Sequence, residues 1–271
     1  MMDRPAAQEL LEIAVEVARE AADTASRMRS EGVSVAATKS TVTDVVTAAD
    51  RAVERQISEA LRRLRPDDAM LGEEYGAAAP GSVAAQVRWI VDPIDGTVNY
   101  LYGLGHSAVS IAAEVEGQVV AGVVRNIHTG EEWTATLGGG AWRAGRRLRC
   151  SAETDLGQTL VITGFGYDPA RRAHQARVVA ELIPQVRDIR RLGAAAIDLC
   201  LVAEGRADAY YEKGLAVWDQ AAGALVATEA GLRVDGLRGR APGPDMVVAA
   251  PAALFTPLHD RLVELDADGG P

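Results

Sequence analysis

The sequence contains few of the residues from which several common kinds of site are built. Only two cysteines occur among 271 residues, Cys150 and Cys200, and they suit neither a disulfide framework nor a zinc spacing. The four histidines, at positions 106, 128, 174 and 259, are scattered and lack metal-ligand spacing. Lysine occurs only at positions 39 and 213, an arginine bias to which we give no functional weight. This use of cysteine is typical of a reducing compartment, so we expect a cytoplasmic protein.

Long apolar runs, internal repeats and an excess of positive charge are missing too. No segment is apolar enough to cross a bilayer, and glutamates interrupt the N-terminal stretch, so we expect neither a secretion signal nor a membrane partner. The net charge of −10 argues against a nucleic-acid partner, because affinity for a phosphate backbone comes from clustered Lys and Arg. The same charge repels an anionic substrate unless divalent cations lie between the two.

The residues that are present predict a folded α/β protein. Hydrophobic residues make up 48% of the chain and charged residues 24%, the balance of a globular protein. Apolar residues at helical spacing predict amphipathic helices over residues 10–21 and 48–64, and short apolar runs between 89 and 136 predict an antiparallel sheet. Farther along, strands are predicted at 160–163, 207–212 and 246–249, and helices at 174–182, 194–203 and 219–230.

The chain is long enough for one large core or for two halves that share it, since domains most often have about 100–150 residues. The stretch from Arg146 to Asp155 has the character of a joint. We therefore expect an N-terminal half over residues 1–149, a C-terminal half over 150–265 and a flexible tail over 266–271.

Residues 89 to 100 form the most informative segment, an apolar run followed by two carboxylates, a glycine and a hydroxyl. Pro93 disfavours a helical conformation at Asp92, so we expect a turn that leaves Asp92 and Asp95 at the carboxyl end of a strand. Gly96 and Thr97 are predicted to begin a helix, whose unpaired N–H groups favour an anion. A plain surface turn uses the same residue types. If the segment is a site, divalent cations and phosphate meet there.

Three more segments bear on this choice. They are Asp44-Val45-Val46-Thr47-Ala48-Ala49-Asp50 with Lys39 before it, Gly72-Glu73-Glu74, and Trp218-Asp219-Gln220-Ala221-Ala222-Gly223. In their order along the chain, all four segments resemble the inositol monophosphatase family, and the resemblance covers nearly the whole sequence. It implies a layered α/β/α/β/α sandwich of the inositol monophosphatase and fructose-1,6-bisphosphatase type. It also implies a homodimer.

The resemblance implies two or three Mg²⁺ ions, which as hard cations prefer oxygen ligands. The implied ligands are Glu73, Asp92, the carbonyl of Ile94, Asp95 and Asp219. Glu73 would hold the attacking water, while the Thr97 hydroxyl pairs with Asp50.

From the residues alone, other roles of these acids stay open. Asp50 and Asp219 could cap helices that begin at Arg51 and Gln220, and Glu73 could lie in a solvated turn.

The substrate side is also implied by the resemblance. Its residues are Asp95, Gly96, Thr97, Gly193, Ala194, Ala195, Glu212 and Asp219. Val98-Asn99-Tyr100 resembles the segment of inositol and sugar phosphatases, so we expect a lithium-sensitive, magnesium-dependent phosphomonoesterase acting on myo-inositol monophosphate or a related polyol phosphate. Fructose-1,6-bisphosphatase activity, histidinol-phosphate phosphatase activity and a non-catalytic regulatory or binding role are the alternatives.

Overall fold

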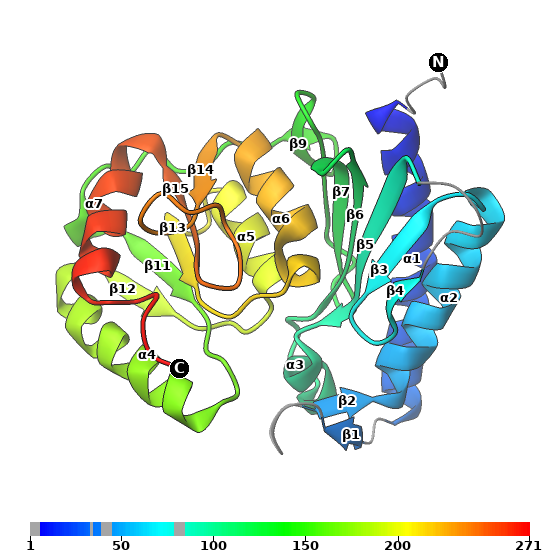
Figure 1. The fold of residues 1–271 in the computed structure, drawn as a ribbon, viewed down its shortest axis with the longest axis horizontal. Coiled ribbons are helices and arrows are strands. Elements are labelled where there is room, and N and C mark those ends of the chain that lie inside the picture. The colour runs from blue at the N-terminus through cyan, green and yellow to red at the C-terminus, as the bar shows by residue number, and fades with distance from the viewer. Residues whose placement is uncertain (1–5, 33–34, 39–44, 79–84) are drawn as a thin grey trace.

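The computed structural model describes residues 6–32, 35–38, 45–78 and 85–271, and it has five layers (Figure 1). Helices α1 (Ala7–Glu31) and α2 (Ala48–Leu64) cover the outer face of an eight-stranded sheet. Helices α5 (Ala195–Ala203) and α6 (Val217–Glu229) lie between this sheet and a five-stranded sheet. Helices α4 (Pro169–Leu182) and α7 (Ala252–Glu264) cover the far face of the second sheet. The predicted layered α/β/α/β/α sandwich is confirmed.

The eight-stranded sheet has the order β10-β9-β8-β7-β6-β5-β3-β4. Its strands are β3 (Ala69–Gly72), β4 (Gly76–Ala78), β5 (Val87–Asp95), β6 (Ala108–Val115), β7 (Gln118–Asn126), β8 (Glu132–Thr136), β9 (Gly140–Arg143) and β10 (Arg146–Arg147). Neighbouring strands are antiparallel, except that β3 and β5 are parallel. Strand β5 continues to Asp95 instead of turning at Asp92, with a register shift between the two. Pro93 has no N–H to continue the ladder, which explains a shift at this point.

The five-stranded sheet has the order β12-β11-β13-β15-β14. Its strands are β11 (Leu160–Thr163), β12 (Asp188–Arg190), β13 (Ala209–Glu212), β14 (Leu232–Asp235) and β15 (Val247–Pro251). Strand β11 is parallel to both of its neighbours, and β15 is antiparallel to both of its own. The remaining elements are the ribbon of β1 (Val35–Thr38) and β2 (Val45–Thr47), the short helix α3 (Thr97–Tyr102), and 3-10 turns at Leu156–Gln158 and Ile183–Gln185.

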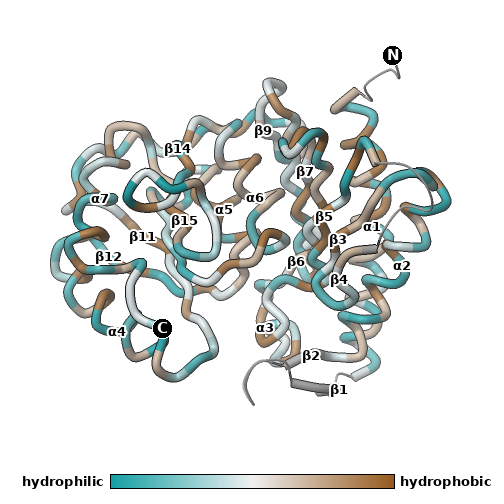
Figure 2. The backbone as a smooth tube through the Cα atoms, viewed as in Figure 1, coloured by the Kyte–Doolittle hydropathy of each residue, from teal (hydrophilic) through white to brown (hydrophobic). Residues whose placement is uncertain are grey.

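Three apolar clusters fill the spaces between the layers. One joins α1 and α2 to the first sheet, one surrounds α5 and α6, and one joins α4 and α7 to the second sheet. All nine residues of α5 are buried, as expected for a helix that is enclosed on every side. Along α1 and α2, by contrast, hydrophobic and hydrophilic stretches alternate (Figure 2), which fits amphipathic helices with one wet face.

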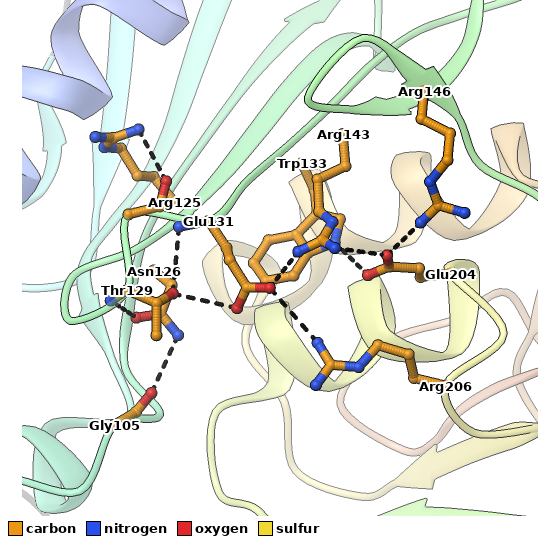
Figure 3. A network of polar contacts seen from close by, with 11 residues as sticks. Gly105, Arg125, Asn126, Thr129, Glu131, Trp133, Arg143, Arg146, Glu204 and Arg206 are labelled. Atoms are coloured by element: carbon orange, nitrogen blue, oxygen red, sulfur yellow. Dashed lines mark hydrogen bonds and ion pairs between the residues drawn. The ribbon is translucent and has the colours of Figure 1, made fainter.

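A polar network links the two predicted halves at one edge of the middle layer (Figure 3). The carboxylate of Glu204, just after α5, pairs with Arg143 at 3.0 Å and with Arg146 at 2.5 Å, and Trp133 Nε1 donates to it at 3.3 Å. Because α5 and α6 also pack on the first sheet, the halves share their core. The division at residue 149 stays a prediction.

The last residues of the chain lie against α4 and the end of β13. Ala267 is buried, His174 Nε2 lies 2.8 Å from the carbonyl oxygen of Asp266, and Arg238 pairs with Asp268 at 3.1 Å. The flexibility of this tail stays a prediction. In the described part of the chain, no helix is both long and apolar enough to cross a membrane.

Candidate active site

A cavity of about 370 Å³ opens where both predicted halves meet. It is lined by Glu73, Asp92, Ile94, Asp95, Gly96, Thr97, Phe165, Gly166, Tyr167, Asp168, Arg171, Arg191, Gly193, Ala195, Glu212, Lys213, Gly214, Leu215 and Asp219. The structure thus brings together all five implied metal ligands, which are separated by up to 146 positions in the sequence (219 minus 73). Lys39 and Asp44, which contributed to the family resemblance, lie outside the described residues.

Strand β5 places Asp92 and Asp95 at the cavity wall. The two residues have exposed fractions of only 1% and 8%. Asp92 Oδ1 accepts a hydrogen bond from the Ile94 amide at 3.1 Å, and Asp95 Oδ2 accepts one from the Ala196 amide at 2.8 Å. Ala196 is the second residue of α5, so the second bond ties the N-terminal half to the middle layer. The bond from the Ala196 amide to Asp95 was not identified from the sequence, because a backbone donor leaves no mark on side-chain chemistry.

Burial raises the pKa of both Asp92 and Asp95 well above the ordinary value. The next cause is negative charge nearby, from Glu73, Asp95 and Asp219 for Asp92, and from Asp219 for Asp95. Glu73 is also a hydrogen-bond partner of Asp92, and this bond raises the Asp92 pKa further. Buried carboxylates that repel one another must share protons or bind a cation.

Asp50 and Asp219 occupy the same position in their helices. Helix α2 begins at Ala48 with Thr47 as its N-cap, and Asp50 Oδ2 accepts a hydrogen bond from the Thr47 amide at 2.8 Å. Helix α6 begins at Val217, and Asp219 Oδ2 accepts one from the Ala216 amide at 2.6 Å. The predicted start of α2 at residue 48 is confirmed, whereas α6 begins two residues before the predicted 219. The alternative in which the two acids cap helices that begin at Arg51 and Gln220 was wrong. Both acids are third helical residues whose carboxylates turn back to the N-cap.

Thr97 lies between Asp50 and the cavity. Its hydroxyl is 3.2 Å from Asp50 Oδ1 and 3.2 Å from the carbonyl oxygen of Ile94, and its single proton can serve one acceptor at a time. Burial raises the pKa of Asp50 to about 6, against the opposing effect of hydrogen bonds from Thr47. Asp50 is therefore a buried acceptor behind Thr97 rather than a cavity-lining group.

The turn that carries Glu73 is held by a buried carboxylate on α2. Glu54 accepts hydrogen bonds from the amides of Glu74 at 2.7 Å and Tyr75 at 3.1 Å. A Cβ added to Gly72 would stand 2.1 Å from Glu54 Oε1, so only glycine allows this approach. Glu54 was missed in the sequence, although a carboxylate beside Val53 and Ile57 on the apolar face of a predicted helix is the signal that could have found it.

The substrate side is formed by the C-terminal half. Glu212 lies beside the cavity, where Tyr210 donates to its Oε2 at 2.7 Å, and burial raises the pKa of Glu212 to about 8. Gly193 and Ala195 line the cavity, whereas Ala194 is buried beneath it. The Ala194 methyl group lies 3.0 Å from where a Cβ of Gly96 would stand, so it supports the Gly96 backbone.

Asn99 and His106 join the two halves below this wall. The Asn99 amide donates to the carbonyl oxygens of His106 and Leu192, both at 2.8 Å. His106 Nε2 lies 2.8 Å from Oδ1 of the fully buried Asp198 on α5. These contacts fix the loop after α3 against the segment that supplies Gly193.

The candidate metal ligands are four carboxylates and one backbone carbonyl. Among the residues that the structure describes, no three His, Cys, Asp or Glu side chains are gathered tightly enough to hold a metal ion as they stand. Glu73 and Asp92 share a hydrogen bond. All the candidate donors are oxygen atoms, most are anionic, and they face one cavity. This set fits a hard divalent cation.

Comparisons with known proteins show which family the chain is similar to. A profile of the inositol monophosphatase family matches residues 6–265. Inositol-1-monophosphatase of Mycobacterium bovis is 48% identical over 222 residues, which cover 79% of this chain and 76% of the relative. A protein of Pseudomonas aeruginosa named Nus factor SuhB is 40% identical over 227 residues, which cover 83% of this chain and 84% of the relative. The solved structure of Mycobacterium tuberculosis SuhB has a TM-score of 0.82 and 40% identity, covering 97% of this chain and 99% of that chain.

Proposed function

The chain belongs to the inositol monophosphatase family, and on that premise we propose that it is a magnesium-dependent phosphomonoesterase. Its proposed substrates are myo-inositol monophosphate and related polyol phosphates, which it hydrolyses to alcohol and inorganic phosphate. The observation that carries this proposal is the convergence of Glu73, Asp92, Asp95 and Asp219 on one cavity, next to the Thr97 hydroxyl.

Glu73, Asp92, Asp95, Asp219 and the Ile94 carbonyl would hold the Mg²⁺ ions. When bound, the ions lower the pKa of water and neutralise charge on the phosphate and the leaving oxygen. Glu73 faces the cavity from the β3–β4 turn and is placed to orient the attacking water. Thr97 contributes a hydroxyl that accepts a proton from that water when it donates its own hydrogen to Asp50.

The substrate is held from both halves in this proposal. The backbone of Gly96 and Thr97 faces the cavity at the start of α3 and is placed to donate to phosphate oxygens. Glu212 and Asp95 are placed to accept hydrogen bonds from hydroxyl groups of the polyol. Gly193 and Ala195 present no bulky side chain, so a ring can approach their backbone.

A regulatory role without catalysis is the alternative from another class, because one relative is named Nus factor SuhB. The complete set of acids and the contact between Thr97 and Asp50 favour a catalytic site. The two roles can also coexist on one fold.

Phosphate release from myo-inositol 1-phosphate, fructose 1,6-bisphosphate and histidinol phosphate, measured with Mg²⁺ and with EDTA, tests the proposal. We expect Mg²⁺-dependent turnover, fastest on the inositol compound, and inhibition by Li⁺. Turnover that persists in EDTA would contradict the metal mechanism.

By family membership we also propose that the protein is a cytoplasmic homodimer. Sedimentation equilibrium measures the mass of the assembly and so tests the dimer.

A further inference from the structure

Tyr210 is a buried side chain that contacts a residue of the cavity wall. It lies on β13 and has an exposed fraction of 0%, and its hydroxyl donates a hydrogen bond to Oε2 of Glu212 at 2.7 Å. Glu212 lines the cavity, whereas Tyr210 is not one of the lining residues. The proposed reaction gives Glu212 a role and leaves Tyr210 without one.

The alternation of side chains along β13 explains the contact. Residues two positions apart on a strand point to the same face, so Tyr210 and Glu212 lie side by side. Tyr210 packs in the apolar cluster around α5 and α6, while Tyr211 packs in the cluster on the opposite face of the sheet. The ring of Tyr210 is therefore held in place by the middle layer, and its hydroxyl is a fixed donor for Glu212.

Gly164 leaves the space that the carboxylate of Glu212 occupies. Strand β11 is parallel to β13 and places Thr163 opposite Tyr211, so Gly164 follows at the level of Glu212. A Cβ on Gly164 would overlap both oxygens and the carboxyl carbon of Glu212. Gly164 does not have a positive φ, so its backbone does not itself require glycine. The glycine at this position thus serves the carboxylate.

The contact with Tyr210 orients a group that would otherwise rotate. The last torsion of a glutamate side chain has broad preferences. Tyr210 engages Oε2, and in the described part of the chain no protein group donates a hydrogen bond to the other oxygen, Oε1. Oε1 is therefore the oxygen that is left for a ligand in the cavity.

Tyr210 is also a donor that keeps its proton. Burial and then the negative charge of Glu212 raise the pKa of Tyr210 well above its ordinary value of 10. Burial raises the pKa of Glu212 to about 8, and the hydrogen bond from Tyr210 opposes this rise. The bond therefore favours the carboxylate form of Glu212, which only accepts hydrogen bonds.

We propose that Tyr210, with the space at Gly164, is a positioning residue for substrate specificity, which presents Oε1 of Glu212 as the acceptor for a hydroxyl group of the substrate alcohol. The inference rests on the proposed phosphatase function and adds to it a residue that does not touch the substrate. Alcohols with ring hydroxyls should be preferred over alcohols of similar shape without them. The reason is that a buried acceptor without a donor is costly.

Kinetics with myo-inositol 1-phosphate and cyclohexyl phosphate test this role, because the two share a six-membered ring and differ in its hydroxyls. Tyr210→Phe removes the phenol oxygen and keeps the ring. We expect it to raise KM for the inositol compound about tenfold with kcat little changed, since a hydrogen bond to a charged group is weakened. The KM of cyclohexyl phosphate, or its inhibition constant if turnover is slow, should not change. Tyr211→Phe is the matched control, because that ring packs on the other face of the sheet.

Two further variants test whether Tyr210 acts through Glu212. In a Glu212→Ala background, Tyr210→Phe should have no further effect on KM, because residues that act as a unit are not additive. Gly164→Ala should reproduce the selective effect of Tyr210→Phe, because its methyl group displaces the carboxylate while the phenol remains. Gly243→Ala is the control for that change, since Gly243 has open space around it.

The outcomes distinguish this role of Tyr210 from the proposed function itself. If Tyr210→Phe changes both constants equally or changes neither, Tyr210 does not set specificity and the phosphatase function stands. An effect of Tyr210→Phe that persists without Glu212 would also overturn the positioning role. A wild-type protein that hydrolyses neither compound would overturn the proposed function, and the role of Tyr210 with it.

Discussion

The backbone amide of Ala196 donates a hydrogen bond to Oδ2 of Asp95 at 2.8 Å, and the two residues come from different halves of the chain. The bond connects the start of α5 to the end of β5. Asp95 also faces the cavity. The same carboxylate that would bind metal therefore also holds the two halves together. Changes at this residue should therefore affect both activity and metal binding.

Asp95→Asn should abolish most activity. The amide keeps an oxygen that can accept from Ala196 but removes a negative charge from the metal set. We expect kcat/KM to fall at least about 10³-fold, because metal polarisation contributes several kcal/mol to catalysis. The rise in Tm that Mg²⁺ gives the wild type should shrink in parallel. Asp23→Asn, an exposed change on α1, is the control, and equal metal stabilisation in both variants would contradict a ligand role.

Thr97→Ala should remove the hydroxyl that links Asp50 to the cavity. Proton transfer by a positioned side chain contributes about 10²–10⁴-fold, so a loss of kcat in this range is expected. Thr97→Ser keeps the hydroxyl and should restore most of the rate. Single-turnover kinetics with both variants provides the measurement. Equal losses in the alanine and serine variants would indicate that the methyl group matters more than the proton.

The stability of the metal-free protein should fall as pH rises from about 4 to about 6. Burial raises the Asp50 pKa from 3.8 to about 6, so the folded protein holds this proton more tightly than the unfolded chain does. The stabilisation from Asp50 is therefore complete below pH 4 and is lost as pH passes 6. Urea unfolding in EDTA across this range measures it. The curve of Asp50→Asn should lack this part of the slope, and an unchanged curve would assign the slope to other acids.

Glu54→Ala should weaken metal binding through the turn that it holds. The change leaves the amides of Glu74 and Tyr75 without their acceptor, at a cost of about 1–3 kcal/mol for each group that stays buried. We expect the Mg²⁺ concentration for half-maximal activity to rise about tenfold or more, as for other residues that orient metal ligands. Glu59→Gln, exposed on the same helix, is the control. If the Mg²⁺ requirement is normal and only the stability is lowered, Glu54 contributes to folding and not to metal binding.

The sequence predicted features that depend on near neighbours along the chain. Helix α2 follows from its apolar spacing, and it spans the predicted residues 48–64. The start of α6 and the alternative roles of Asp50 and Asp219 as N-caps were wrong, because an acid in the first turn of a helix suits either the N-cap or the third position. Thr47 before Asp50 is the capping pair that could have decided the first case.

Features that depend on docking could not be predicted from local pattern. The Ala196 amide reaches Asp95 only when α5 lies against β5. Arg171 and Lys213 likewise donate hydrogen bonds to the last residues of the chain only in the folded protein. The family resemblance supplied the metal ligands because it carries information about tertiary structure. It did not supply Arg171, Arg191 and Lys213, which also line the cavity.

The hydrogen bond from Arg171 to Pro271 has a practical consequence for work with this protein. Any affinity tag or reporter fused after Pro271 would emerge beside Arg171, which lines the cavity, and is expected to hinder the binding of ligands. Helix α1 lies in the outer helical layer, on the face of the eight-stranded sheet opposite to α5 and α6 (Figure 1). A fusion before α1 is therefore expected to be remote from the candidate active site. Comparing the activity of the protein tagged at one end with that of the protein tagged at the other is thus an inexpensive first assay.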